Sequence, residues 1–181
     1  NIRRRRGTNR AAAKLLAIVV TLSGAIEIAP RPALAWGNEG HAIVAIIADH
    51  YLDPTVRRKV RAMLAADTDS LTAHDIESEA AWADKYRDSD RRTTHERYNQ
   101  TRNWHFVDLE LDHPDLAHAC LGRTALPRGI VASTGPARAC VIDKINQFAA
   151  ELAAPETNAE ERRVALKCML HLVGDVHQRL H

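Results

Sequence analysis

Aromatic residues are scarce in this 181-residue chain, at 4%, although hydrophobic residues of all kinds make up 45%. A core therefore has to be built mainly from aliphatic side chains. The sequence also lacks alternating strand patterns, internal repeats and a glycine-rich phosphate loop. Apolar runs with helical spacing, separated by proline-rich loops, instead predict an all-α fold, and the length predicts one domain.

Basic residues do not outnumber acidic residues once the first 35 residues are set aside. The full chain has 25 Lys/Arg and 23 Asp/Glu, but residues 36–181 carry only 18 bases against 22 acids. This balance implies no broad basic surface for clamping a nucleic-acid backbone. Any phosphate chemistry would need its positive charge from a bound metal.

Residues 1–35 have the three-part pattern of an export signal peptide. A basic start that includes Arg3–Arg6 precedes the apolar run Leu15–Ile26 and the small-residue sequence Ala33-Leu34-Ala35. The run is too short for a transmembrane helix, which needs about 20 residues, and a buried N-terminal helix is the alternative. We expect cleavage after Ala35, a secreted or periplasmic location and no membrane anchor, which leaves residues 36–181 as the folded part.

Only three cysteines are present. Export permits disulfides, and Cys120 and Cys140 lie in a stretch rich in glycine and proline where they could pair, but the sequence leaves this pairing open. Cys168, within a predicted helix, has the character of a small buried hydrophobic residue.

The last eleven residues concentrate groups that can bind metal. His171 and Asp175 are four residues apart, so a helix places them on one face, and His181 follows six residues later. Imidazole and carboxylate are ligands that zinc prefers in a tetrahedral shell. For this spacing alone, surface residues on an amphipathic helix are the more common alternative.

The expected mature N-terminus offers a second set of ligands. Cleavage would give Trp36 a free α-amino group, which can chelate a metal together with its own carbonyl, and His41 lies five residues away. The segment Ala42–Ala48 is so apolar that it predicts a largely buried helix.

Further helices are predicted from spacing and caps. Pro54 favours a helix over 55–64, Asn158 caps the last helix, and Asp88–Thr101 is left open as helix or loop. Other predicted helices cover residues 76–86 and 139–153. Trp82 is expected to pack inward, and Asp84 and Arg87 are three apart, as in a surface ion pair.

Four motifs occur in an order that resembles the S-one/P-one nuclease family, the zinc-dependent single-strand-specific nucleases and 3′-nucleotidases. The motifs are Trp36-Gly-x-x-Gly-His41, Trp82-Ala-Asp84-x-x-Arg87, His105-Phe-x-Asp108 and His171-x-x-Gly-Asp175-x-x-Gln-x-Leu-His181. The resemblance implies a mostly helical fold akin to the zinc phospholipases C.

Three zinc ions are implied by the resemblance, with two complete ligand sets in this sequence. Trp36 and His41 hold one ion, Asp175 bridges to a second, and His181 is one ligand of the third. The second ion takes Asp84, His105 and His171 as further ligands. Asp84, Asp175 and Arg87 are the implied catalytic residues, with Arg87 facing the phosphate.

The implied reaction is hydrolysis of single-stranded DNA or RNA to 5′-phosphate products, and removal of 3′-phosphate from nucleotides, by a hydroxide that the zinc ions activate. Phe106 matches the base-stacking position and Asp108 the base-contacting position. We expect a monomer.

Two departures from the family pattern affect the third zinc. Arg179 stands where the family has proline, and the sequence ends at His181, so we expect an N-terminal part of the domain with further ligands beyond it. Two alternatives stay open: a zinc phospholipase C, and an exported helical metal-binding protein without catalysis. The Phe106-x-Asp108 pair favours a base as ligand over a lipid.

Overall fold

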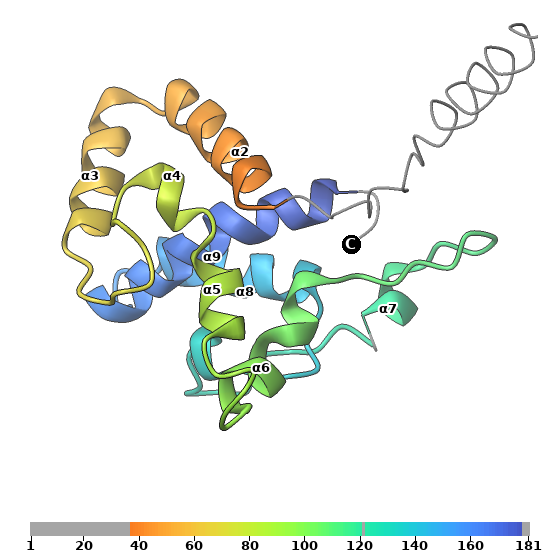
Figure 1. Ribbon diagram of the computed structural model, residues 1–181. Helices are drawn as coiled ribbons and strands as arrows, with labels where there is room; N and C mark the ends of the chain where they lie inside the picture. Colours follow the sequence, from red (N-terminus) through yellow and green to blue (C-terminus); the bar gives the residue numbers. More distant parts are fainter. Residues whose placement is uncertain (1–36, 121, 179–181) are drawn as a thin grey trace, which may run out of the picture. The chain divides into compact units, whose positions relative to one another are not determined.

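Helices are the only regular elements in the part of the chain that the computed structural model describes, residues 37–120 and 122–178 (Figure 1). The all-α prediction is confirmed. The elements are α2 (Asn38–Tyr51), α3 (Pro54–Ala65), α4 (Ile76–Glu79), α5 (Trp82–Asp88), α6 (Glu96–Thr101), η1 (Arg102–His105), α7 (Leu116–Ala119), η2 (Ala132–Thr134), α8 (Val141–Ala153) and α9 (Ala159–His177).

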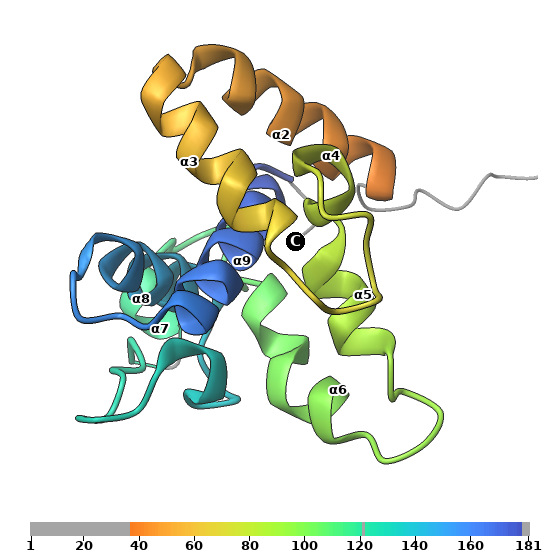
Figure 2. The ribbon, with the colours of Figure 1, turned by 90° about the vertical axis from the view of Figure 1, so that its left-hand side faces the viewer.

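The long helix α9 is central to this arrangement, since it packs against α8, α2, α4, α5 and both 3-10 helices (Figures 1 and 2). The amide of Glu161 donates to the Asn158 side chain at 2.9 Å, so the predicted cap is confirmed. Cys168 and Leu172 face the core, where Phe148 of α8 is completely buried. The α8–α9 pair therefore forms the support against which α2, α4, α5 and the two 3-10 helices lie.

One predicted helix, residues 76–86, is divided in the structure into α4 and α5. The Asp75 side chain accepts from the Ser78 amide at 2.8 Å and caps α4. The chain then turns at Ala80 and Ala81, which are both buried. The Ala80 carbonyl accepts a hydrogen bond from His171 at 2.7 Å. The prediction of one uninterrupted helix was wrong because the Ala80 carbonyl at the turn accepts a hydrogen bond from another helix.

Helix α2 has only one buried face, formed by His41, Ala45 and Asp49 at four-residue spacing. Ile43 and Ile47, by contrast, are 57% and 53% exposed. The expectation that this apolar helix is largely buried was wrong. Its polar residues take the inward face because His41 meets Asp175 and the Asp49 carboxylate accepts from an arginine of α3.

A disulfide joins Cys120, directly after α7, to Cys140, directly before α8. It ties the loop-rich segment to the core, and Cys168 is buried as a free thiol. No helix within the described ranges combines the length and the apolar character that a membrane span requires.

Candidate metal centre

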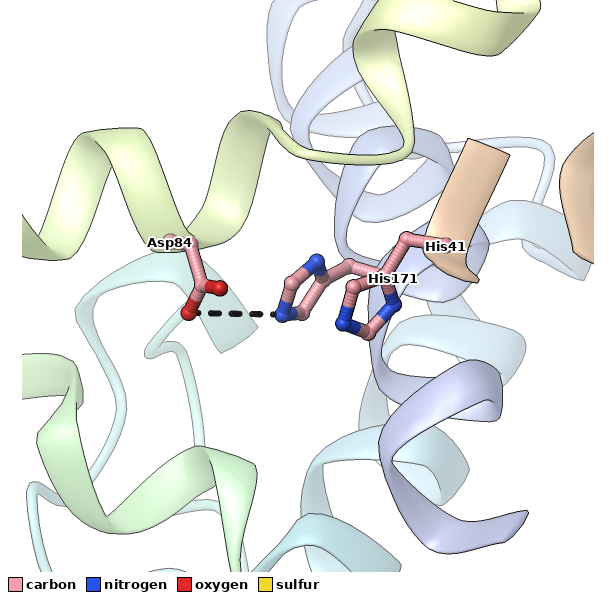
Figure 3. A group of neighbouring side chains, drawn as sticks. All are labelled: His41, Asp84 and His171. Carbon is pink, nitrogen blue, oxygen red and sulfur yellow. Dashed lines mark ion pairs between the residues drawn. The ribbon is translucent and has the colours of Figure 1, made fainter. Parts of the chain in front are cut away.

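Five predicted ligands from four separate elements converge on one buried cluster. His41 lies near the start of α2, Asp84 in α5 and His105 at the end of η1, while α9 contributes His171 and Asp175. Figure 3 shows three of them, with Asp84 and His41 reaching toward His171 from opposite sides. All but Asp84 are at most 1% exposed. The α9 face predicted from the spacing of His171 and Asp175 is confirmed.

The Asp175 carboxylate faces three imidazoles with its two oxygens. Its Oδ2 is 2.9 Å from Nδ1 of His105 and 3.2 Å from Nε2 of His171. Its Oδ1 is 3.4 Å from Nε2 of His41. Because the two oxygens face different imidazoles, this carboxylate has the geometry of a bridge between two metal positions.

Asp84 faces the same two imidazoles, His105 and His171, that Asp175 Oδ2 faces. Its Oδ1 is 3.5 Å from Nε2 of His171 and 3.6 Å from Nδ1 of His105. Zinc bonds of 2.0–2.1 Å in a tetrahedral shell separate neighbouring ligand atoms by about 3.4 Å. The measured separations within Asp84, His105, His171 and Asp175 surround this value.

The ring of His171 is oriented by the protein backbone. Its Nδ1–H donates to the Ala80 carbonyl at 2.7 Å, which turns Nε2 toward the carboxylates of Asp84 and Asp175. Such a hydrogen bond is the usual way in which proteins orient a metal-binding histidine. The His41 ring stacks on His171 with 3.8 Å between centroids, directly over Gly174. Sequence reasoning missed Ala80, and the glycine of the His-x-x-Gly-Asp motif was the one signal for Gly174.

Several buried nitrogen atoms of the cluster lack a hydrogen-bond partner among the described residues. Both ring nitrogens of His41 and Nε2 of His171 are buried and make no hydrogen bond of acceptable geometry with another described residue, although carboxylate oxygens lie 3.2–3.5 Å away. A buried polar group left without a partner costs about 1–3 kcal/mol. Three imidazoles and two carboxylates are a donor set that zinc accepts, so these residues fit the metal.

Strong coupling between charges shifts the pKa values in the cluster. Burial alone would raise the pKa of Asp84 and Asp175, but the facing imidazoles outweigh burial and hold both well below the ordinary range. Burial disfavours the charged form of His171, but the two carboxylates raise its pKa to about 9. Burial lowers the pKa of His41 to about 4. Without metal, the cluster therefore holds two carboxylates and a proton on His171, which a zinc ion would replace.

Arg87 joins this cluster through Asp84. Its Nη1 lies 2.6 Å from the Asp84 oxygen that faces the imidazoles. Its Nε and Nη2 donate to Asp88 at 3.0 and 2.9 Å. The ion pair that the sequence offered as the alternative is thus present, and it holds the guanidinium beside the candidate ligands.

The two predicted base-binding residues follow His105 on extended chain. Phe106 is 41% exposed, with its ring 6.3 Å from that of His105. Asp108 lines a pocket of about 500 Å³ together with residues of α7 and of the loop that precedes it. Trp36 and His181 lie outside the described residues, so their placement stays a prediction.

A second buried charge cluster, missed from the sequence, fixes α5 against α9. Lys167 is 2% exposed, and its ammonium group pairs with Asp67 and Asp69 and lies 3.9 Å from the centroid of the Trp82 ring. The Trp82 indole donates to Asp69 at 2.5 Å. Since Lys167 precedes His171 by one helical turn and Trp82 precedes Asp84 by two residues, this contact sets how α5 lies beside the metal ligands.

Comparison with known proteins finds that the family described as S1/P1 Nuclease matches residues 36–181. Among similar proteins, Nuclease P1 of Penicillium citrinum is 29% identical over 150 residues, which are 81% of this chain and 47% of that protein. Nuclease S1 of Aspergillus oryzae is 27% identical over 146 residues, or 81% and 44%. Endonuclease 2 of Arabidopsis thaliana is 28% identical over 151 residues, or 81% and 45%. The chain thus spans about half the length of these relatives.

Proposed function

The chain belongs to the S1/P1 nuclease family, and from this premise we propose that the protein is a zinc-dependent nuclease that hydrolyses single-stranded DNA and RNA to 5′-phosphate products. The same site would remove the 3′-phosphate from nucleotides. The names of its relatives, Nuclease P1, Nuclease S1 and Endonuclease 2, support a nuclease activity. The observation that carries the proposal is the Asp175 carboxylate, whose Oδ2 faces His105 and His171 and whose Oδ1 faces His41.

Zinc would be held at two positions by the described residues. Asp84, His105, His171 and Asp175 would hold one ion. His41 and Asp175 would hold the other together with the proposed N-terminal ligand Trp36, while His181 would serve a third. The chemistry that zinc supplies when bound is Lewis acidity, which lowers the pKa of a water to about 7. The acidic chain thereby also gains positive charge for a polyanionic substrate.

Residues of the chain itself would orient the substrate. Arg87 is fixed on both sides by Asp84 and Asp88, which leaves its guanidinium preorganised beside the centre to bind phosphate oxygens. The exposed Phe106 ring offers a face on which a base can stack, and the Asp108 carboxylate can accept from an exocyclic amino group. Only an unpaired base can stack in this way, which accounts for a preference for single strands.

The cellular location and the processing of the chain follow from the same proposal. Residues 1–35 would direct export and be removed, and residues 36–181 would belong to the catalytic domain of a secreted or periplasmic enzyme that acts as a monomer. The disulfide Cys120–Cys140 agrees with an oxidising compartment.

The test is hydrolysis by protein that begins at Trp36, dialysed against zinc and then freed of excess metal. We expect cleavage of a single-stranded oligonucleotide, slower cleavage of the same sequence as duplex, and none of a phosphatidylcholine. Arg87→Ala should lower the rate by on the order of 100-fold or more and retain zinc, whereas Asp84→Asn should lose zinc and activity together.

Cleavage of the lipid instead would favour the phospholipase alternative. Zinc binding without hydrolysis of any substrate would favour a non-catalytic metal-binding protein.

A further inference from the structure

Exposed arginines gather on residues 88–102, which we name the α5–α6 arm. The arm begins at Asp88, the last residue of α5, and ends at Arg102, the first residue of η1. Arg87 directly precedes it and His105 follows its end by three residues, so chain neighbours of both ends belong to the candidate metal centre. Figure 2 shows the loop between α5 and α6 standing out from the helices around it. Whatever binds the arm is therefore connected to the centre at both of the arm's ends.

Positive charge is concentrated here. The arm holds four arginines against three acids, whereas residues 36–181 as a whole hold 18 bases against 22 acids. Lys85 and Arg87 directly before the arm bring the count to six bases in the 18 residues 85–102, with Asp84 next to this range. The acidic average of the chain conceals this local surface, which is why composition did not predict it.

Two of the acids in the arm are engaged within the structure. Asp88 pairs with Arg87 through both oxygens. Asp90 accepts from the backbone amides of Arg97 and Tyr98 at 2.8 and 3.1 Å, and from Thr94 Oγ1 at 2.9 Å. The Asp90 carboxylate thereby closes the loop onto α6 and fixes the conformation in which the arginines are displayed.

The arginines themselves remain accessible. Arg91, at 57% exposure, lies 3.8 Å from an Asp88 oxygen and 5.0 Å from the Tyr98 ring centroid. Arg97 donates to Ser89 Oγ at 3.0 Å and lies 4.7 Å from the Tyr86 ring centroid. The exposed side chains of Arg92 and Arg102 make no hydrogen bond or ion pair with another residue in the described ranges. Guanidinium groups of this kind bind phosphate through paired N–H donors, and neighbouring aromatic rings can stack on bases.

Helix α3 also carries four basic residues, but two of them hold neighbouring helices together. Arg57 donates to the Asp49 carbonyl at 2.8 Å, and Arg61 donates to the Asp49 carboxylate at 2.7 Å. These contacts hold α2 to α3. Arg58 and Lys59 are exposed and are not used in these contacts, and neither flanks a candidate ligand of the centre.

We propose that the α5–α6 arm binds the backbone phosphates of a single-stranded polynucleotide whose scissile bond lies at the metal centre. This inference rests on the proposed nuclease function and extends it: the arm gives the enzyme its affinity for polymers, because only a polymer offers phosphates beyond the one at the centre.

The experiment compares Arg92→Gln/Arg102→Gln with the charge-matched control Arg58→Gln/Lys59→Gln, in zinc-loaded protein. Substrates are a single-stranded 20-mer and a 3′-mononucleotide. We expect the arm variant to raise KM for the 20-mer on the order of tenfold at low salt, with kcat and mononucleotide hydrolysis unchanged. Loss of two phosphate contacts should also reduce the slope of log affinity against log salt by about 1.4. The control should match wild type for both substrates.

The inference fails if the arm variant leaves KM for the 20-mer unchanged, if the control raises it equally, or if mononucleotide hydrolysis falls to the same extent. In each of these outcomes wild type still hydrolyses its substrates, so the proposed function stands. If wild type hydrolyses neither substrate, the proposed function fails and the inference falls with it. Unchanged circular-dichroism melting of both variants verifies that folding is intact.

Discussion

Replacement of Gly174 by alanine tests how closely the metal centre is packed. A methyl group at this position would lie 2.7 Å from Nδ1 of His41 and 3.2 Å from its Cε1. Ordinary contact begins at 3.4 Å, so the imidazole has to move by about 0.7 Å. Metal–ligand distances tolerate only about 0.2 Å. The substitution should therefore remove His41 from zinc binding.

The two effects of Gly174→Ala on stability oppose each other. Alanine favours a helix interior over glycine by about 0.5–1 kcal/mol, whereas an overpacked contact costs about 1–3 kcal/mol. We expect a net loss of roughly 1 kcal/mol in metal-free protein. The larger effect should be on zinc, with one ion lost from the His41 position and the ion at Asp84, His105 and His171 retained.

Elemental analysis after dialysis gives the zinc content of the variant, and urea unfolding in the presence of EDTA gives its metal-free stability. Val173→Ala, a change at the preceding residue of the same helix, is the control and should retain all zinc. Wild-type zinc content and affinity in Gly174→Ala would refute the packing argument, because the His41 ring would then not depend on the absence of a side chain.

Three further predictions concern protons and the N-terminus. Burial and the nearby Glu161 carboxylate raise the pKa of Glu151 to about 7, so this acid costs stability increasingly as pH rises from 4.5 to 7. Glu151→Gln should melt like wild type near pH 4.5 and at higher temperature above pH 7, and equal melting at both pH values would contradict this. The pKa of His171 is raised to about 9, so zinc binding at pH 7.5 should release close to one proton from this residue. Calorimetry in buffers of different ionisation enthalpy measures this release. A binding enthalpy that does not change with the buffer would contradict the prediction. One extra residue before Trp36 should abolish hydrolysis by blocking the α-amino ligand, and full activity would exclude that ligand.

The side chains of the candidate centre were identified from the sequence, whereas the buried Lys167 pairs beside it were not. His171 and Asp175 share a helical face because of their four-residue spacing, and the structure brings His41, Asp84 and His105 to them. The motifs supplied the identity of these residues, but no spacing along the chain could show that one Asp175 oxygen faces His41 and the other faces His105 and His171.

Contacts made by the backbone were not predictable. The Ala80 carbonyl orients His171 and interrupts the helix expected over residues 76–86, but nothing in an Ala-Ala sequence indicates a turn. The apolar composition of α2 likewise concealed which face is inward. In that helix the polar contacts of His41 and Asp49 decide the orientation, and they leave Ile43 half exposed.

The measurement that tests the central claim most directly is the zinc content of protein starting at Trp36, compared between wild type and Asp175→Asn. An amide side chain keeps the size of the carboxylate but loses its charge and its ability to bridge two ions. The account predicts at least two zinc ions in wild type and the loss of both in the variant. Loss of a single ion would contradict the bridging role of Asp175, and absence of zinc from folded wild-type protein would contradict the metal centre itself.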